Sequence, residues 1–122
     1  MSELKTVGEV YMVYVGLVQL DQQLEKVAPE IRLRIGINMN KMRPTAEVFE
    51  RTQSRTVADI SEAGETNTAR VQYSINEAIF KLRSEECSIE VRTFKETDLN
   101  LSENPKVTAD TLSKIMSVLE LE

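Results

Sequence analysis

The 122-residue sequence predicts a mainly α-helical (α+β) fold: one domain, residues 1–122, with three or four helices around a single core and a short minor β element near residues 88–94. Three observations lead to this prediction. Apolar residues recur at helical spacing in several long segments, proline and glycine separate these segments, and clear alternation of apolar and polar residues is confined to two short stretches. A chain of this length can bury one hydrophobic core.

The first predicted helix starts near Thr6, in the segment TVGEVYMVYVGLVQLDQQLEKV. Thr6 followed three residues later by Glu9 is the capping-box pattern, and apolar residues then recur at helical spacing through Leu24. The β-branched and aromatic residues of this segment favour a strand, but its length favours a helix. Gly8 and Gly16 each weaken a helix by about 1 kcal/mol relative to alanine, unless they allow another element to pack closely.

The next segment, IRLRIGINMN at residues 31–40, fits two structures. Its unbroken alternation of apolar and polar residues is typical of a strand. Pro29, however, suits the first turn of a helix, and an apolar stripe at helical spacing continues to Met42. Pro44 is then expected to break or kink whatever precedes it. These residues alone leave helix and strand open.

The rest of the chain completes the predicted architecture. Residues 45–64 form a helix that stops at Gly64, and residues 69–86 form the clearest amphipathic helix of the chain. The segment CSIEVRTF predicts a strand, which needs a partner strand from elsewhere in the chain or from a second subunit. Thr108 is the predicted N-cap of a closing helix.

Composition excludes several functional classes. The net charge of −5 argues against direct nucleic-acid binding, which requires a basic surface. The sequence contains no histidine, which excludes Ser-His-Asp and Cys-His nucleophile systems and histidine-bearing zinc sites. Its four glycines are isolated, so no phosphate-binding loop is recognisable. We therefore expect a protein that is not an enzyme and has no cofactor or metal.

The single cysteine, Cys87, allows no intramolecular disulfide and fits a cytoplasmic setting. Glu85 and Glu86 precede it, and their charge should raise the pKa of the thiol, which favours a buried or incidental thiol over a nucleophile. The longest apolar run, VYMVYVGLV, is too short to span a bilayer, so no membrane association is predicted.

Three arginines are the sharpest candidates for ligand binding. Arg32, Arg34 and Arg43 could form a pocket for an anion, because the guanidinium fork matches phosphate geometry. This hypothesis depends on the strand interpretation, since Arg32 and Arg34 share one face of a strand but lie on different sides of a helix. The alternative is that all three are solvated or paired with acidic side chains.

Two other groups of residues are candidates for a functional role. Tyr11, Met12 and Tyr14 form an apolar strip on the first helix that is either core or a contact between two copies of the chain. A protein of this size has few other elements to bury the apolar surface of its first helix. We therefore expect a second subunit to bury part of it, in a homodimer. The acidic pairs Glu85 with Glu86 and Glu62 with Glu65 could hold a cation or act in acid–base chemistry, but solvated surface is the simpler interpretation.

The order of several short motifs extends over nearly the whole chain: VGEVYMVYVGLVQL, Pro29, Asn38, KMRPTAEVFERTQ, EAGE, CSIEVRTF and VTADTLSKIM. This order resembles a family of small uncharacterised proteins encoded by tailed phages and prophages. In that family the stretch after the proline looks helical, so the resemblance implies a helix from Pro29 that is kinked near Pro44. The family has no known activity, and the resemblance therefore supplies context and no chemistry.

The leading functional hypothesis is a phage-type accessory binding protein in the cytoplasm of a bacterial host. A small acidic chain suits a basic surface on a host or phage protein, either as an inhibitor of a host or anti-phage defence protein or as an assembly factor. The alternative is a protein that binds a small anion, such as a nucleotide or signalling molecule, with arginines at a subunit interface. A metal-dependent hydrolase that uses the carboxylates ranks third.

Overall fold

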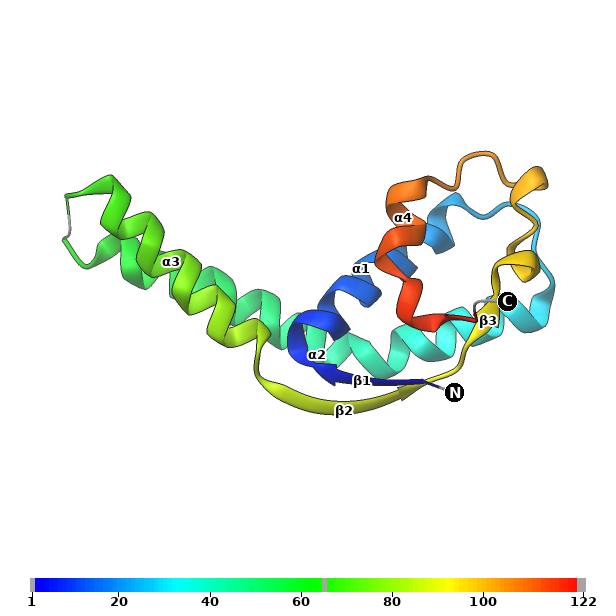
Figure 1. Cartoon of the computed structure of the whole chain (residues 1–122), viewed down its shortest axis with the longest axis horizontal. Helices are drawn as coiled ribbons and strands as arrows, with labels where there is room; N and C mark the ends of the chain where they lie inside the picture. Colours follow the sequence, from blue (N-terminus) through cyan, green and yellow to red (C-terminus); the bar gives the residue numbers. More distant parts are fainter. Residues whose placement is uncertain (1, 65, 121–122) are drawn as a thin grey trace.

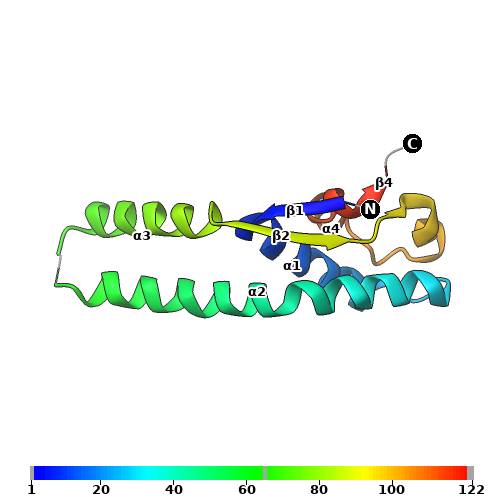
Figure 2. The same cartoon turned by 90° about the horizontal axis from the view of Figure 1, so that it is seen from below.

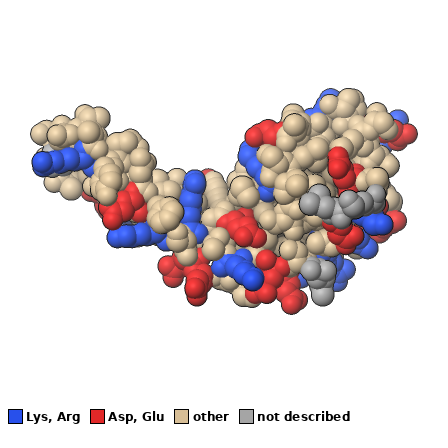
Figure 3. Space-filling view, in the orientation of Figure 1, with Lys and Arg blue, Asp and Glu red and all other residues tan. Residues whose placement is uncertain are grey.

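The computed structural model describes residues 2–64 and 66–120, and it consists of a body from which a helical arm projects (Figure 1). We call the part of α2 after Pro44, together with α3, the arm, and the rest the body. The arm is narrow and the body is wide in the space-filling view (Figure 3). The main elements are β1 (Ser2–Thr6), α1 (Val7–Gln23), α2 (Pro29–Glu62), α3 (Thr68–Arg83), β2 (Glu86–Val91), β3 (Phe94–Lys95), α4 (Ala109–Lys114) and β4 (Leu119–Glu120).

The predicted fold class is confirmed: the protein is mainly helical, with four helices packed together and small two-stranded sheets. Short 3₁₀ helices occupy Glu96–Leu99 and Leu101–Glu103, between β3 and α4, and Met116–Val118, between α4 and β4. Helix α3 lies along the second half of α2, whereas α1, α4 and the strands gather on its first half (Figures 1 and 2).

Residues 31–40 are helical and belong to the first half of α2. Ile31, Ile35 and Asn38 are buried at helical spacing, and the buried stripe continues to Met42. The helical conformation leaves the apolar side chain of Leu33 in contact with solvent, with 63% of its surface exposed. Helical packing against α1 therefore overrides the alternating pattern, which would have placed Leu33 on the same face as Ile31 and Ile35.

Pro44 lies inside α2 and does not end it. Proline has no amide hydrogen, so the carbonyl of Asn40 loses its usual donor four residues later and the helix is free to bend there. Figure 1 shows α2 turning upward in its second half, which leads the arm away from the body. The predicted kink is thus a bend in one continuous helix.

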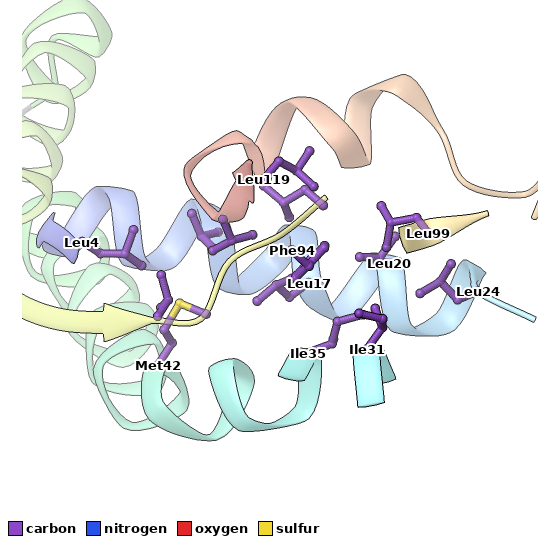
Figure 4. Packing of buried hydrophobic residues seen from close by; sticks show 14 of the residues in the cluster. Leu4, Leu17, Leu20, Leu24, Ile31, Ile35, Met42, Phe94, Leu99 and Leu119 are labelled. Carbon is purple, nitrogen blue, oxygen red and sulfur yellow. The ribbon is translucent and has the colours of Figure 1, made fainter. Parts of the chain in front are cut away.

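The core lies between α1 and the first half of α2, beneath the strands and the C-terminal segments (Figure 4). Helix α1 presents a buried stripe at helical spacing toward α2, and the last third of the chain closes the other side. Phe94 is the largest fully buried side chain. The buried apolar residues of this cluster are Leu4, Val10, Val13, Leu17, Leu20, Leu24, Ile31, Ile35, Met42, Val91, Phe94, Leu99, Ile115, Val118 and Leu119.

Strand β1 is the partner that the predicted β element required. It pairs antiparallel with β2, with Leu4 opposite Ile89 and an irregularity between Leu4 and Thr6. Sequence analysis missed β1, because it is five residues long and contains a single buried residue, Leu4. Strands β3 and β4 pair in parallel, with Phe94 opposite Leu119.

The predicted helix caps are confirmed at both ends of the chain. The Thr6 hydroxyl accepts a hydrogen bond from the Glu9 amide at 3.2 Å, and the Thr108 hydroxyl accepts one from the Thr111 amide at 3.1 Å. Helix α4 is nevertheless shorter than expected and stops at Lys114. The 3₁₀ turn that follows directs the buried side chain of Val118 into the core.

Two buried asparagines in turn fasten irregular backbone to the helices. The Asn38 side chain in α2 donates to the Arg92 carbonyl at 2.8 Å and accepts from the Arg92 amide at 2.9 Å. It thereby satisfies both polar groups of a residue that has just left β2. This pair of bonds holds the link between β2 and β3 against α2.

Asn104 does the same for the connection between α1 and α2. Its Oδ1 accepts from the amides of Glu25 and Lys26 at 2.7 and 2.8 Å. Its Nδ2 donates to the carbonyls of Lys26, Leu99 and Asn100 at 2.8 to 3.0 Å. One buried side chain thus joins two loops that are far apart in the sequence.

Replacing Asn104 with alanine should lower the free energy of unfolding by about 3 kcal/mol, because it leaves several partly buried backbone groups without partners. Denaturant unfolding would measure the loss. Gln22→Ala, at an exposed position of α1, is the control and should change stability by less than about 0.5 kcal/mol. Equal effects of the two substitutions would contradict the role assigned to Asn104.

Gly16 and Gly36 both lie inside helices, but the space around them differs. A Cβ on Gly16 would lie 2.7 Å from Ile115 Cγ2 and Lys114 Cβ, whereas a Cβ on Gly36 would meet nothing within 4 Å. Gly16→Ala should therefore cost about 1–2 kcal/mol through overpacking against α4. Gly36→Ala should stabilise the protein by about 0.5–1 kcal/mol. Thermal unfolding of the two variants checks this difference in sign.

Candidate interaction surfaces

The arm is a helical hairpin in which α3 runs antiparallel to the second half of α2 (Figure 2). Gly64, which follows α2, has a positive φ of 83°, a conformation that ends helices and favours glycine. Asn67 then caps α3 by accepting a hydrogen bond from the Arg70 amide at 3.2 Å. The predicted stop at Gly64 is confirmed, and this turn reverses the chain.

The two helices of the arm face each other with apolar side chains, but the contact is thin. None of the residues of α3 is buried, and those that face α2 are only half-buried. The second half of α2 has two buried residues, Ala46 and Phe49, both close to the body. The half-buried apolar residues of the contact are Val57, Ile60, Val71, Ile75, Ala78, Ile79 and Leu82.

Helix α3 also carries apolar side chains on the side that faces away from α2. Tyr73 and Phe80 are each 70% exposed and lie seven residues apart, so they share one line along the helix. Ala69 and Asn76 are exposed on the same line. We call these four residues the outer face of α3. Both views show this side of α3 uncovered by any other described element (Figures 1 and 2).

Sequence analysis noted the amphipathic pattern of α3 but missed its outer face. Tyr73 and Phe80 lie roughly opposite the stripe formed by Val71, Ile75 and Leu82. An apolar pair outside the main stripe of an amphipathic helix is the pattern that could have revealed it.

An apolar notch of about 390 Å³ lies at the base of the arm, where the start of α1, the middle of α2 and the end of α3 meet. Val48 is its most exposed large hydrophobic side chain, with 53% of its surface open to solvent. Glu85 is the single charged residue in its wall. Figure 3 shows the surface hollowed between the arm and the body, with acidic and basic groups at the waist. The notch is lined by Val7, Pro44, Thr45, Val48, Phe49, Thr52, Leu82 and Glu85.

The three candidate arginines do not converge. Arg32 is paired with Asp21 at 3.0 Å and also donates to the Leu24 carbonyl. Arg34 donates to the Thr93 carbonyl at 3.3 Å, on a different side of α2. Each of these contacts joins α2 to another segment of the body, and Arg32 has the acidic partner that the alternative interpretation expects.

Arg43, the third candidate, has partners of its own. Its Nε donates to the Tyr14 hydroxyl at 3.4 Å, and its Nη1 donates to Asn40 Oδ1 at 2.9 Å. Because residues 31–40 are helical, the condition for a joint Arg32, Arg34 and Arg43 pocket is not met. The structure places these arginines as separate contacts along α2.

The tyrosines of the first helix pack mainly within the chain. Tyr11 is half-buried, and its ring meets that of Phe49 edge-on, with centroids 4.8 Å apart. Tyr14 is half-buried and bonded to Arg43. Met12 differs, since it is exposed. Of the strip proposed as a dimer contact, Tyr11 and Tyr14 therefore help to join α1 to α2, and Met12 faces outward.

The candidate carboxylate pairs form no metal site in the part of the chain that the structure describes. Residues 2–64 and 66–120 contain no group of three or more acidic or cysteine side chains arranged to hold a metal ion. Glu85 and Glu86 are exposed, and so is Glu62. Glu65, the partner predicted for Glu62, lies outside the described residues.

Comparisons of the chain with protein-family models, with curated proteins and with solved structures find no match. The resemblance to small phage proteins therefore stays a prediction based on the order of short motifs. Within the described residues, even the 34-residue helix α2 is not apolar enough to cross a membrane. The notch and the outer face of α3 are the two apolar surface features of the described residues from which a function can be proposed.

Cys87 is half-buried, and its Sγ lies 3.9 Å from the Leu4 carbonyl. Burial is the main cause that raises the pKa of its thiol, and the negative charge of Glu9 raises it further. The direction agrees with the sequence prediction, but the carboxylate responsible is Glu9 on α1, which packs beside β2.

We predict that this thiol reacts slowly with an alkylating reagent at about pH 8, because a raised pKa leaves less thiolate than a free cysteine has. Unfolding the chain in urea should restore the ordinary pKa and accelerate the reaction. The rate in the folded chain should also begin to rise at a higher pH than the rate in the unfolded chain. Mass spectrometry of timed samples measures both rates; a folded rate equal to or above the unfolded one contradicts the prediction.

Proposed function

We propose that this chain is a non-enzymatic accessory binding protein of phage type, which holds a basic and apolar segment of a protein partner in the notch at the base of its arm. The observation that carries this proposal is the notch itself, an apolar hollow bordered by one carboxylate at the junction of three helices. Clefts between helices are common binding sites, and mostly apolar walls with few polar groups are typical of them.

The size and chemistry of the notch indicate what would fill it. A volume of about 390 Å³ falls at the small end of ligand pockets, which suits one or two side chains of a partner rather than a large cofactor. Val7, Pro44 and Leu82 supply apolar wall, so the inserted side chain is aliphatic or aromatic. The hydroxyls of Thr45 and Thr52 add polar groups at the wall.

The charge around the notch favours a basic flank on the inserted segment. Glu85 lies in the wall, and Glu86 follows it in the chain. Glu9 lies in the first turn of α1, close enough to act on Cys87. Arg83 is the single basic residue among positions 83–86, and the whole chain carries a net charge of −5. The net negative charge of the chain attracts basic partners and raises their association rate, and Glu85 is the charge in the wall that such a partner would meet.

A protein that occupies a basic surface in this way acts as an inhibitor of a host or anti-phage defence protein when it blocks another ligand. It acts as an assembly factor when it holds the partner in place. The alternative function, binding of a small anion by Arg32, Arg34 and Arg43, receives less support, because these side chains contact separate parts of the body.

The proposal is tested by capture of a partner from a bacterial lysate on the tagged chain, at low and at moderate salt. The expected result is one dominant protein whose capture weakens as the salt concentration rises. Val48→Glu, which places a charge at the mouth of the notch, should reduce its affinity at least about 30-fold. Glu85→Gln should reduce the affinity less and make it less sensitive to salt.

Leu33→Glu is the matched control, because Leu33 is an aliphatic residue on α2 that is 63% exposed, against 53% for Val48, and lies outside the notch. It should capture the partner as the unchanged chain does. A partner that binds the Val48→Glu variant with full affinity would contradict the notch as the binding site. Absence of any salt-sensitive partner would contradict the proposed function as a whole.

A further inference from the structure

We infer that the outer face of α3 is a contact between two copies of this chain, with the two α3 helices antiparallel. In this arrangement Phe80 of one copy packs against Ala69 of the other, and Tyr73 packs against Asn76. The contact shares no residue with the notch, so it stands apart from the proposed function.

The first support comes from where the exposed apolar side chains lie. Tyr73 and Phe80 are the most exposed large hydrophobic residues in the described part of the chain, and both belong to one line on one helix. The second half of α2 offers a contrast, because its exposed residues include Arg51, Arg55 and Glu62. Helix α3 also has exposed charged residues, but they lie beside the line on which its two aromatic rings stand.

The second support is the spacing of the outer face. Ala69, Tyr73, Asn76 and Phe80 are separated by four, three and four residues, the spacing at which two helices pack side chains into each other. We place two α3 helices antiparallel, with the twofold axis passing between residues 74 and 75. In this register each large side chain of one copy meets a smaller side chain of the other. Phe80 lies over alanine and Tyr73 over asparagine, and twofold symmetry repeats both contacts.

Charge complementarity beside the outer face indicates that the partner that covers it is a second copy of this chain. Arg70 and Glu77 are exposed and lie seven residues apart on the same flank of the outer face. Glu77 also lies 3.5 Å from Lys81 within the same helix, and both side chains of this pair are open to solvent. In the antiparallel register Arg70 of each copy comes opposite Glu77 of the other. Two pairs of opposite charge therefore border the aromatic contact, one on each side of the symmetry axis. In a parallel arrangement the same flank of the two copies would lie on opposite sides of the contact, so Arg70 of one copy would not meet Glu77 of the other.

The size of the contact sets the expected affinity. Residues 69–80 extend over about 18 Å at 1.5 Å per residue, so the buried area is smaller than the roughly 800 Å² per partner of a standard interface. Aromatic rings are the side chains that contribute most to such contacts. We therefore expect a dissociation constant in the micromolar range, with dimer dominant at about 100 μM.

Sedimentation equilibrium of the full chain over a range of concentrations measures this directly, and twice 13.9 kDa is the mass expected at the upper end. Phe80→Glu should raise the dissociation constant at least about 100-fold. Leu33→Glu again serves as the control, because it adds the same charge at a residue that is 63% exposed on the body, and it should leave the dimer intact.

Charge reversal tests the register. Arg70→Glu and Glu77→Arg should each raise the dissociation constant of the homodimer about tenfold, because two attractive pairs become repulsive. An equimolar mixture of the two variants should form a mixed dimer at least as strong as the original, since every pair is then of opposite sign. The double variant R70E/E77R should likewise dimerise as the unchanged chain does.

Each other outcome overturns the inference. A chain that stays monomeric at about 100 μM has no such contact. A dimer that is indifferent to Phe80→Glu uses another surface, for example the one around Met12. A dimer that is lost in Phe80→Glu but not rescued by mixing the two charge variants has a different register. None of these results changes the expected capture of a partner by the notch, which is tested with Val48→Glu.

Discussion

The continuity of α2 is the constraint on which the rest of the molecule depends. Its first half is one wall of the core, and its second half is the support on which α3 lies. With 34 residues it is about three times as long as an average helix. Pro44 stands at the border between the two halves, and the helix bends there without ending. A helix that stopped at Pro44 would leave α3 without its apolar partner and the arm would not exist.

The edge-on contact between Tyr11 and Phe49 fixes the direction in which the arm leaves the body. Phe49 is the last buried residue of α2, and its ring lies against Tyr11 of α1, five residues beyond Pro44. Past this point no residue of the described arm is buried. Phe49 also lines the notch, so one of the two rings that orient the arm forms part of the wall of the proposed binding site.

In the body, two asparagine side chains supply hydrogen bonds to backbone groups that no strand or helix pairs. Asn38 and Asn104 accept hydrogen bonds from loop amides and donate hydrogen bonds to loop carbonyls. Among the described residues, no buried side-chain nitrogen or oxygen lacks a hydrogen-bond partner. The core itself is aliphatic apart from Phe94 and Met42, as the low aromatic content of the sequence leads one to expect.

Local sequence rules predicted the elements whose ends are set by local chemistry. Thr6, Gly64 and Thr108 act as the caps and stops that their residue types indicate, because a cap depends on neighbours within four residues. Strand β1 and the short α4 depend on contacts with distant segments, and local patterns could not predict them. Local patterns could not predict the notch either, since its residues Val7, Val48 and Leu82 come from three helices. The arginine hypothesis depended on a strand, and the helix at residues 31–40 separates its members.

The least buried part of the molecule is also the part that both proposed contacts touch. Helix α3 has no buried residue of its own, and its apolar contact with α2 is only half-buried. In the proposals above, a partner in the notch would contact Leu82 near the C-terminal end of α3, and a second copy would cover Tyr73 and Phe80 along its length. The two sites share no residue, so a substitution that removes one of them leaves the side chains of the other in place. The notch depends on three helices meeting at the base of the arm, whereas the outer face depends on the sequence of α3 alone.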